Sequence, residues 1–185
     1  MVSLTTFCGT MGSAQNSTNS DSLRVEEEYR RFFDNELEIS ASTFEQATAD
    51  YIRLVAGNSF PEERQLQLSL AEAHILCGLL SGLTSELFPI VIENHSDQVF
   101  DLPIRTFMLA GAYYAIGDFE QAAETYRAAI DRLDPAKRPY NFAHLNLAST
   151  YNELGMYDEA VSTLNALLVN PAIQLEGYEM GDLFL

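Results

Sequence analysis

The chain has 185 residues, 47% of them hydrophobic and 20% charged, which is the composition of one ordinary globular domain. Acidic residues outnumber basic ones by 27 to 10, so the formal net charge is −17, and Lys137 is the only lysine. A negative field of this size argues against binding to nucleic acid or to an anionic membrane, because both begin with the neutralisation of phosphates. It favours basic or amphipathic protein partners, or it serves only to keep the chain in solution.

The N-terminal residues and the cysteines favour a reducing intracellular compartment. The first 20 residues contain neither Arg nor Lys and no long apolar run, so they resemble neither a secretory signal nor a mitochondrial presequence. No stretch approaches the ~18 apolar residues that a membrane-spanning helix needs. Cys8 and Cys77 are too few for a disulfide framework. We therefore expect a cytoplasmic protein with no membrane insertion.

Three regions follow one another along the chain. Residues 1–22 are rich in Ser, Thr, Asn and Gly, and we expect a disordered polar tail because so few large apolar side chains cannot offset the entropy of ordering. Residues 23–170 are predicted to form the folded domain. Residues 171–185 are acidic with an apolar end, so they are not the polar cap of a helical stack. They could pack on the preceding helices, enter a groove, or be the start of a truncated helix.

Apolar residues in the folded region recur every three or four positions, which predicts helices and no strands. The expected helices form four hairpins with a period of about 38–40 residues. The first helices are expected at residues 23–39, 61–77, 103–116 and 140–154. The second helices are expected at residues 42–56, 83–94, 118–133 and 156–169. Pro89 should kink or shorten the helix at 83–94, because proline lacks a backbone donor.

A duplicated segment supports this period. Residues 44–51 read FEQATADY and residues 119–126 read FEQAAETY, 75 residues or about two periods later. Gly78, Gly117 and Gly155 recur at intervals of 39 and 38 residues, where the turns between helices are expected. The two segments are thus predicted to be the same stretch of the second helix in the first and third hairpins.

The pattern resembles the tetratricopeptide repeat, most closely in residues 103–135 and 141–171. The residues that match its structural positions are Leu109, Ala110, Tyr113, Gly117, Ala122 and Tyr126 in the first of these units, and Leu147, Ala148, Tyr151, Gly155 and Ala160 in the second. The two earlier units match only in part. The resemblance implies an all-α, right-handed solenoid of antiparallel helical hairpins.

The same resemblance implies a partner-binding groove, lined by the first helix of each hairpin. Its predicted residues are Gln65, Leu68, Ser69, Glu72, Ile104, Phe107, Met108, Gly111, Tyr114, Phe142, Leu145, Asn146, Ser149, Asn152 and Glu153. Phe107, Met108 and Tyr114 would suit an apolar anchor from a peptide or helix. Phe107 and Leu145 could equally belong to the core between repeats.

Three functions are compatible with the sequence. The first is a non-enzymatic scaffold or adaptor that binds a basic or amphipathic protein segment, as a subunit of a multiprotein complex or a homodimer. The second is a small acidic tetratricopeptide chaperone that shields an apolar client. The third is an enzyme or metal site at His74 and Cys77, which share a helix face; a buried structural pair explains them better. No catalytic residue, metal or cofactor is expected.

Overall fold

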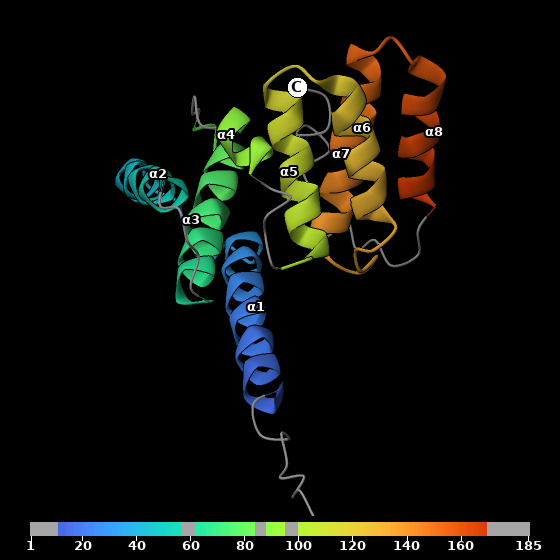
Figure 1. The fold of residues 1–185 in the computed structure, drawn as a ribbon. Coiled ribbons are helices and arrows are strands. Elements are labelled where there is room, and N and C mark those ends of the chain that lie inside the picture. The colour runs from blue at the N-terminus through green and yellow to red at the C-terminus, as the bar shows by residue number, and fades with distance from the viewer. Residues whose placement is uncertain (1–10, 57–61, 84–87, 95–99, 170–185) are drawn as a thin grey trace, which may run out of the picture.

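The structure, a computed structural model, describes residues 11–56, 62–83, 88–94 and 100–169, and in these ranges the chain forms helices and no strand (Figure 1). The helices are α1 (Met11–Phe33), α2 (Ala41–Val55), α3 (Glu62–Leu80), α4 (Phe88–Glu93), α5 (Pro103–Ala115), α6 (Phe119–Ile130), α7 (Arg138–Glu153) and α8 (Tyr157–Leu168). The prediction of an all-α helical repeat is confirmed. None of these helices has the length and apolar character needed to cross a bilayer.

Local sequence signals set where the helices begin. Ser40 caps α2, because its Oγ accepts a hydrogen bond from the backbone N–H of Thr43 at 3.2 Å. Asp118 caps α6 in the same way. Pro103 and Pro139 lie in the first turns of α5 and α7, where proline's missing N–H leaves no hydrogen bond unmade.

Two glycines set where α5 and α7 end. Gly117 and Gly155 have φ angles of 82° and 71°, in the left-handed region that glycine adopts without strain. The next backbone N–H then reaches back over the last turn: Asp118 N donates to the Tyr113 carbonyl at 3.0 Å, and Met156 N to the Tyr151 carbonyl at 2.8 Å. These Schellman turns reverse the chain at once, so α5–α6 and α7–α8 form tight hairpins (Figure 1).

Small residues let the helices approach closely. Most residues that match the repeat pattern lie in the core: Leu109, Ala110, Ala122, Tyr126, Leu147, Ala148, Tyr151 and Ala160 are buried, and Tyr113 is half-buried. The duplicated segments occupy the same place in α2 and α6, with Ala47 and Tyr51 buried in one and Ala122 and Tyr126 in the other. Each of these two helices packs on the first helix that follows it, α2 on α3 and α6 on α7.

The N-terminal half departs from the predicted hairpins. The helix α1 begins at Met11 rather than residue 23, so residues 11–22 of the predicted tail are helical. From residue 19 on, where burial is described, the first buried side chain is Val25. The helix α1 packs on α3 and α5 instead of pairing with α2. With Pro89 in its first turn, α4 is only six residues long and packs on α5 rather than on α3. Residues 1–10 and 170–185 lie outside the described residues, as do the predictions made for them.

Candidate partner-binding site

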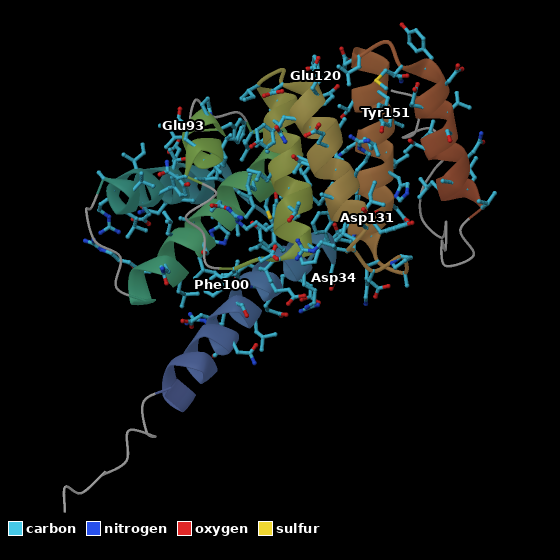
Figure 2. All side chains as sticks on the ribbon, turned by 45° about the vertical axis from the view of Figure 1, so that its right-hand side comes forward. Asp34, Glu93, Phe100, Glu120, Asp131 and Tyr151 are labelled. Carbon is cyan, nitrogen blue, oxygen red and sulfur yellow. The ribbon has the colours of Figure 1, made fainter. Side chains whose placement is uncertain are left out.

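The candidate site is the face formed by α3, α5 and α7, the helices predicted to line a groove. The helix α3 packs on α5, and α5 packs on α7, so the three lie in a row. The helix α1 lies across this row, because it contacts α3 and α5, and its Phe33 reaches Phe142 of α7. Figure 2 shows the end of α1, marked by Asp34, under the helices of the C-terminal half. The chain's own first helix therefore covers part of the face.

A single stripe of α1 makes most of this contact. Val25, Tyr29 and Phe33 are each at most 5% exposed, and their spacing of four places them on one side of the helix. The Phe33 ring lies 5.9 Å from the Phe107 ring and 6.0 Å from the Phe142 ring, between centroids. Each buried side chain of this size contributes about 1.5–3 kcal/mol. Apolar burial is therefore the main term that holds α1 on the face.

Polar contacts fix α1 on either side of Tyr29. Arg138 Nη1 donates to the Phe33 carbonyl oxygen at 2.7 Å, and its guanidinium lies 5.8 Å from the centroid of the Phe142 ring. A cation at this place satisfies a free carbonyl and opposes the negative end of the helix dipole. One turn earlier, Glu28 Oε2 lies 3.5 Å from His74 Nε2.

The position of α1 corrects part of the predicted groove. Leu68, Glu72, Phe107 and Met108 are at most 5% exposed, so they are core residues and cannot meet a partner in this arrangement. The prediction paired α1 with α2, which would have left the α3–α5–α7 face open. For two of these core residues α1 is the cover: Phe107 packs against Phe33, and Glu72 lies near Tyr29.

A buried ion pair joins α3 to α5 beneath α1. Arg105 Nε donates to Glu72 Oε1 at 2.5 Å, and Glu72 has no exposed surface. Tyr29 of α1 and Tyr51 of α2 are near these charges: burial raises the pKa of both hydroxyls, and the Glu72 carboxylate raises it further. Neither tyrosine hydroxyl has a hydrogen-bond partner among the described residues. We interpret this ion pair as structural, because Glu72 is fully buried and Arg105 is 9% exposed.

Another part of the face is open. A hollow of about 260 Å³ lies between the end of α3, α5 and α7. Its lining residues are Leu79, Leu80, Gly111, Tyr114, Ala115, Tyr126, Asn146 and Ser149. The hollow is smaller than the about 300–1,000 Å³ of typical small-molecule sites, so it suits a side chain of a protein partner better.

The groups that line the hollow are suited to non-covalent binding. Gly111 leaves room in its wall, and Tyr126, which is hydrogen-bonded to Asn146, adds a phenol group. Tyr114 at the rim is hydrogen-bonded to Glu153. Burial raises the pKa of both tyrosines, so both hydroxyls stay neutral at physiological pH. The hollow thus offers apolar and aromatic surface with neutral hydrogen-bonding groups.

The other predicted groove residues lie around the covered and open parts. Ile104, Phe142 and Leu145 are half-buried, as is Gln65, while Ser69 is buried. Asn152 and Glu153 at the end of α7 are exposed, as is Ser149 in the hollow. The residues of the groove prediction that a partner can reach therefore cluster on α5 and the second half of α7.

A larger depression of about 650 Å³ lies elsewhere, between α2 and α3. Its polar side chains already bind one another: Gln46 Nε2 donates to Asp50 Oδ2 at 2.9 Å, and Arg53 Nη2 donates to Asp50 Oδ1 at 2.7 Å. It lies on the α2 side of α3, and no residue of α5 or α7 lines it. We therefore place the candidate site at the smaller hollow, which has the aromatic and apolar wall of a protein-binding site.

The arrangement at His74 and Cys77 does not favour catalysis. Cys77 is fully buried, and burial raises the pKa of its thiol, whereas a nucleophilic cysteine needs a lowered one. The His74 side chain is 27% exposed and faces Glu28. Within the described ranges, no group of three or more His, Cys, Asp or Glu residues could hold a metal ion.

Several residues of the site were missed by sequence reasoning. Leu79, Leu80 and Ala115 line the hollow but lie at the ends of their helices, where predicted boundaries are least certain. Arg105 had a detectable signal, because it shares a helix side with the buried residues Leu109 and Ala112. A charge on an apolar stripe indicates a buried partner.

The fold defines a class of protein: an all-α helical repeat solenoid in which the helices α3, α5 and α7 lie in a row. Residues 107–173, from α5 to beyond α8, match the model of the tetratricopeptide repeat family. This part of the chain therefore carries tetratricopeptide repeats, as the sequence pattern of residues 103–135 and 141–171 predicted. Such repeats generally mediate protein–protein interactions, and proteins built from them are typically not enzymes. No curated protein and no solved structure shows significant similarity to the chain.

Proposed function

We propose that this protein is a non-enzymatic interaction module that binds a segment of a partner protein at the open part of the α3–α5–α7 face. The observation that carries the proposal is the hollow around Gly111, to which the helices α3, α5, α6 and α7 contribute apolar, aromatic and neutral polar groups. A pocket of this kind accepts one anchor side chain, which is how most protein interfaces concentrate their binding energy.

The charge of the protein supports a basic or amphipathic partner. The net charge is −17, and Glu153, which is hydrogen-bonded to Tyr114 at the rim of the hollow, is exposed. A basic residue beside the anchor would meet this carboxylate, and the overall field would speed the encounter. In this proposal the protein acts as a scaffold or adaptor within a larger complex, in a reducing intracellular compartment.

The replacement of Gly111 by leucine tests the proposal. A Cβ at this position would lie 3.4 Å from Leu79 Cδ2 and 3.5 Å from Tyr126 Oη, which are ordinary contacts, so a larger side chain would extend into the hollow. The matched control is Ala128→Leu on the exposed side of α6. Partners captured by the wild-type chain are expressed alone, and their affinity is measured by calorimetry.

We expect Gly111→Leu to weaken binding at least tenfold, about 1.4 kcal/mol, and Ala128→Leu to leave it unchanged. Circular dichroism confirms that both variants keep their helices. Equal affinity of the wild type and Gly111→Leu would show that partners bind elsewhere, and the proposal would be wrong.

A second candidate is a dedicated acidic chaperone that shields an apolar client. One observation favours it: Tyr157, Val161 and Leu168 on one side of α8 are 66%, 58% and 66% exposed. A chaperone would form a one-to-one complex with a single client and prevent its aggregation, measured by light scattering. A scaffold would bind two different chains at once and would not change the solubility of either.

A further inference from the structure

We propose that α1 is a ligand held in cis, and that an amphipathic helix of a partner protein can replace it on the α3–α5–α7 face. The partner helix carries a large apolar side chain at every fourth position, as α1 does with Val25, Tyr29 and Phe33. The inference adds to the proposed function, because it concerns the covered part of the face and does not require the open hollow.

The position of α1 is the first argument. In a helical solenoid each element contacts its immediate neighbours along the stack. The helix α1 contacts its neighbour α3, but it also contacts α5, and it reaches α7 through Phe33. It packs across successive first helices, while the second helix of its own predicted hairpin, α2, packs on α3. The helix α1 is therefore laid across the stack, as a bound peptide helix would be.

The recognition of α1 is the second argument. Large apolar residues at intervals of four, pressed into a face made by other helices, are the usual way in which a groove binds a helix. The outer side of α1 makes its ion pairs within its own segment: Arg30 contacts Glu27 and Asp34, each at 2.6 Å. The helices α3, α5 and α7 thus contact α1 through one apolar stripe and two nearby polar groups, the Glu28 carboxylate and the Phe33 carbonyl.

The fit of Tyr29 is the third argument. Its hydroxyl is buried beside Glu72 and Arg105, and none of the described residues forms a hydrogen bond with it. A buried hydroxyl without a partner weakens the contact that it belongs to. A helix with phenylalanine at this position would make the same apolar contact without that loss. A helix with phenylalanine at this position should therefore bind the α3–α5–α7 face more tightly than α1 does.

These contacts define the partner helix. It presents apolar or aromatic residues at the three stripe positions, with phenylalanine preferred at the place of Tyr29. An acidic residue at the place of Glu28 meets His74, and the last carbonyls meet Arg138. The rest of the helix is neutral or basic, because the protein carries a net charge of −17.

The test uses the full chain and a fluorescent synthetic peptide with the sequence of residues 19–37 and the change Tyr29→Phe. The control peptide also carries Val25→Ser and Phe33→Ser. Binding is followed by anisotropy, and hydrogen exchange of residues 25–33 in α1 is compared with that of residues 107–115 in α5. We expect saturable binding of the first peptide only, and faster exchange in α1 than in α5, which accelerates when the peptide is added.

Two chain variants separate displacement from a purely structural role. Tyr29→Phe in the chain should raise the melting temperature and weaken peptide binding severalfold, because α1 then packs more tightly on the α3–α5–α7 face. A fixed core helix would change the melting temperature alone. Gly111→Leu should leave peptide binding unchanged, which keeps this test independent of the open hollow.

Two results would overturn the inference. The first is no binding of the peptide, with exchange of α1 as slow as that of α5, which would make α1 a permanent part of the core. The second is binding of the peptide without any change in the exchange of α1, which would place the peptide elsewhere.

Discussion

The replacement of Arg105 by methionine should destabilise the protein by about 3–5 kcal/mol. Glu72 has no exposed surface and Arg105 is 9% exposed, so the variant would leave a buried carboxylate without its charged partner. The loss of one member of a buried ion pair costs about 3–5 kcal/mol, whereas replacing both members by apolar residues of similar size is often neutral or stabilising. The double variant Glu72→Leu with Arg105→Met should therefore recover most of the stability.

The assay is urea unfolding at pH 7, followed by far-ultraviolet circular dichroism, for the wild type, both single variants and the double variant. The double-mutant cycle then gives the coupling energy between the two side chains. We expect a coupling of several kcal/mol. A loss below about 1 kcal/mol in Arg105→Met, or a double variant less stable than both single variants, would show that the pair does not hold α3 and α5 together.

Three further changes test the packing and the electrostatics. Gly78→Ala should destabilise by about 1–3 kcal/mol, because a Cβ there would collide with the Phe44 ring, whereas Gly111→Ala should be neutral or add up to about 1 kcal/mol of helix propensity. Melting temperatures that shift equally in the two variants would contradict this. Ala122→Leu should overpack the hairpin of α5 and α6 and cost about 1–3 kcal/mol, so an unchanged urea midpoint would reveal spare room there. Burial raises the pKa of the Cys77 thiol above its ordinary value of 9.0, so above pH 9 the unfolded chain loses this proton while the folded chain keeps it. The free energy of unfolding should therefore fall as the pH rises above 9, by up to about 1.4 kcal/mol per pH unit. Between pH 9 and 10, Cys77→Ala should lower this slope, and equal slopes of the unfolding free energy in the two proteins would refute the assignment.

The C-terminal half of the fold was predictable because its signals are local. Proline in the first turns of α5 and α7, and glycine in the turns that end them, mark these helices within a few residues. The three- and four-residue spacing of apolar side chains then identifies their buried sides. Because each of these hairpins has a turn of three residues, its two helices must pack against each other.

The N-terminal half was less predictable because its contacts are distant in sequence. The spacing of Val25, Tyr29 and Phe33 shows that one side of α1 is buried, but amphipathicity does not say which surface buries it. The seven residues that join α1 to α2 allow more than one placement. Once α1 lies across the first helices, Phe107 and Glu72 change from groove residues to core residues, although nothing in their own sequence neighbourhood differs.

The duplicated segment illustrates why the strongest sequence signal is not the functional one. In α2 and α6 the same residues have the same packing role. The small residue, Ala47 or Ala122, allows neighbouring helices to approach closely, and the tyrosine, Tyr51 or Tyr126, fills the space beside it. Both tyrosines point their rings into the core, yet only Tyr126 also reaches the hollow, where it is hydrogen-bonded to Asn146. Tyr51 instead lies near Glu72 and Arg105, the ion pair that also has Tyr29 of α1 beside it. The repeat therefore sets the scaffold, and equivalent positions in it differ in exposure according to what packs on them, so we expect a partner to contact Tyr126 and not Tyr51.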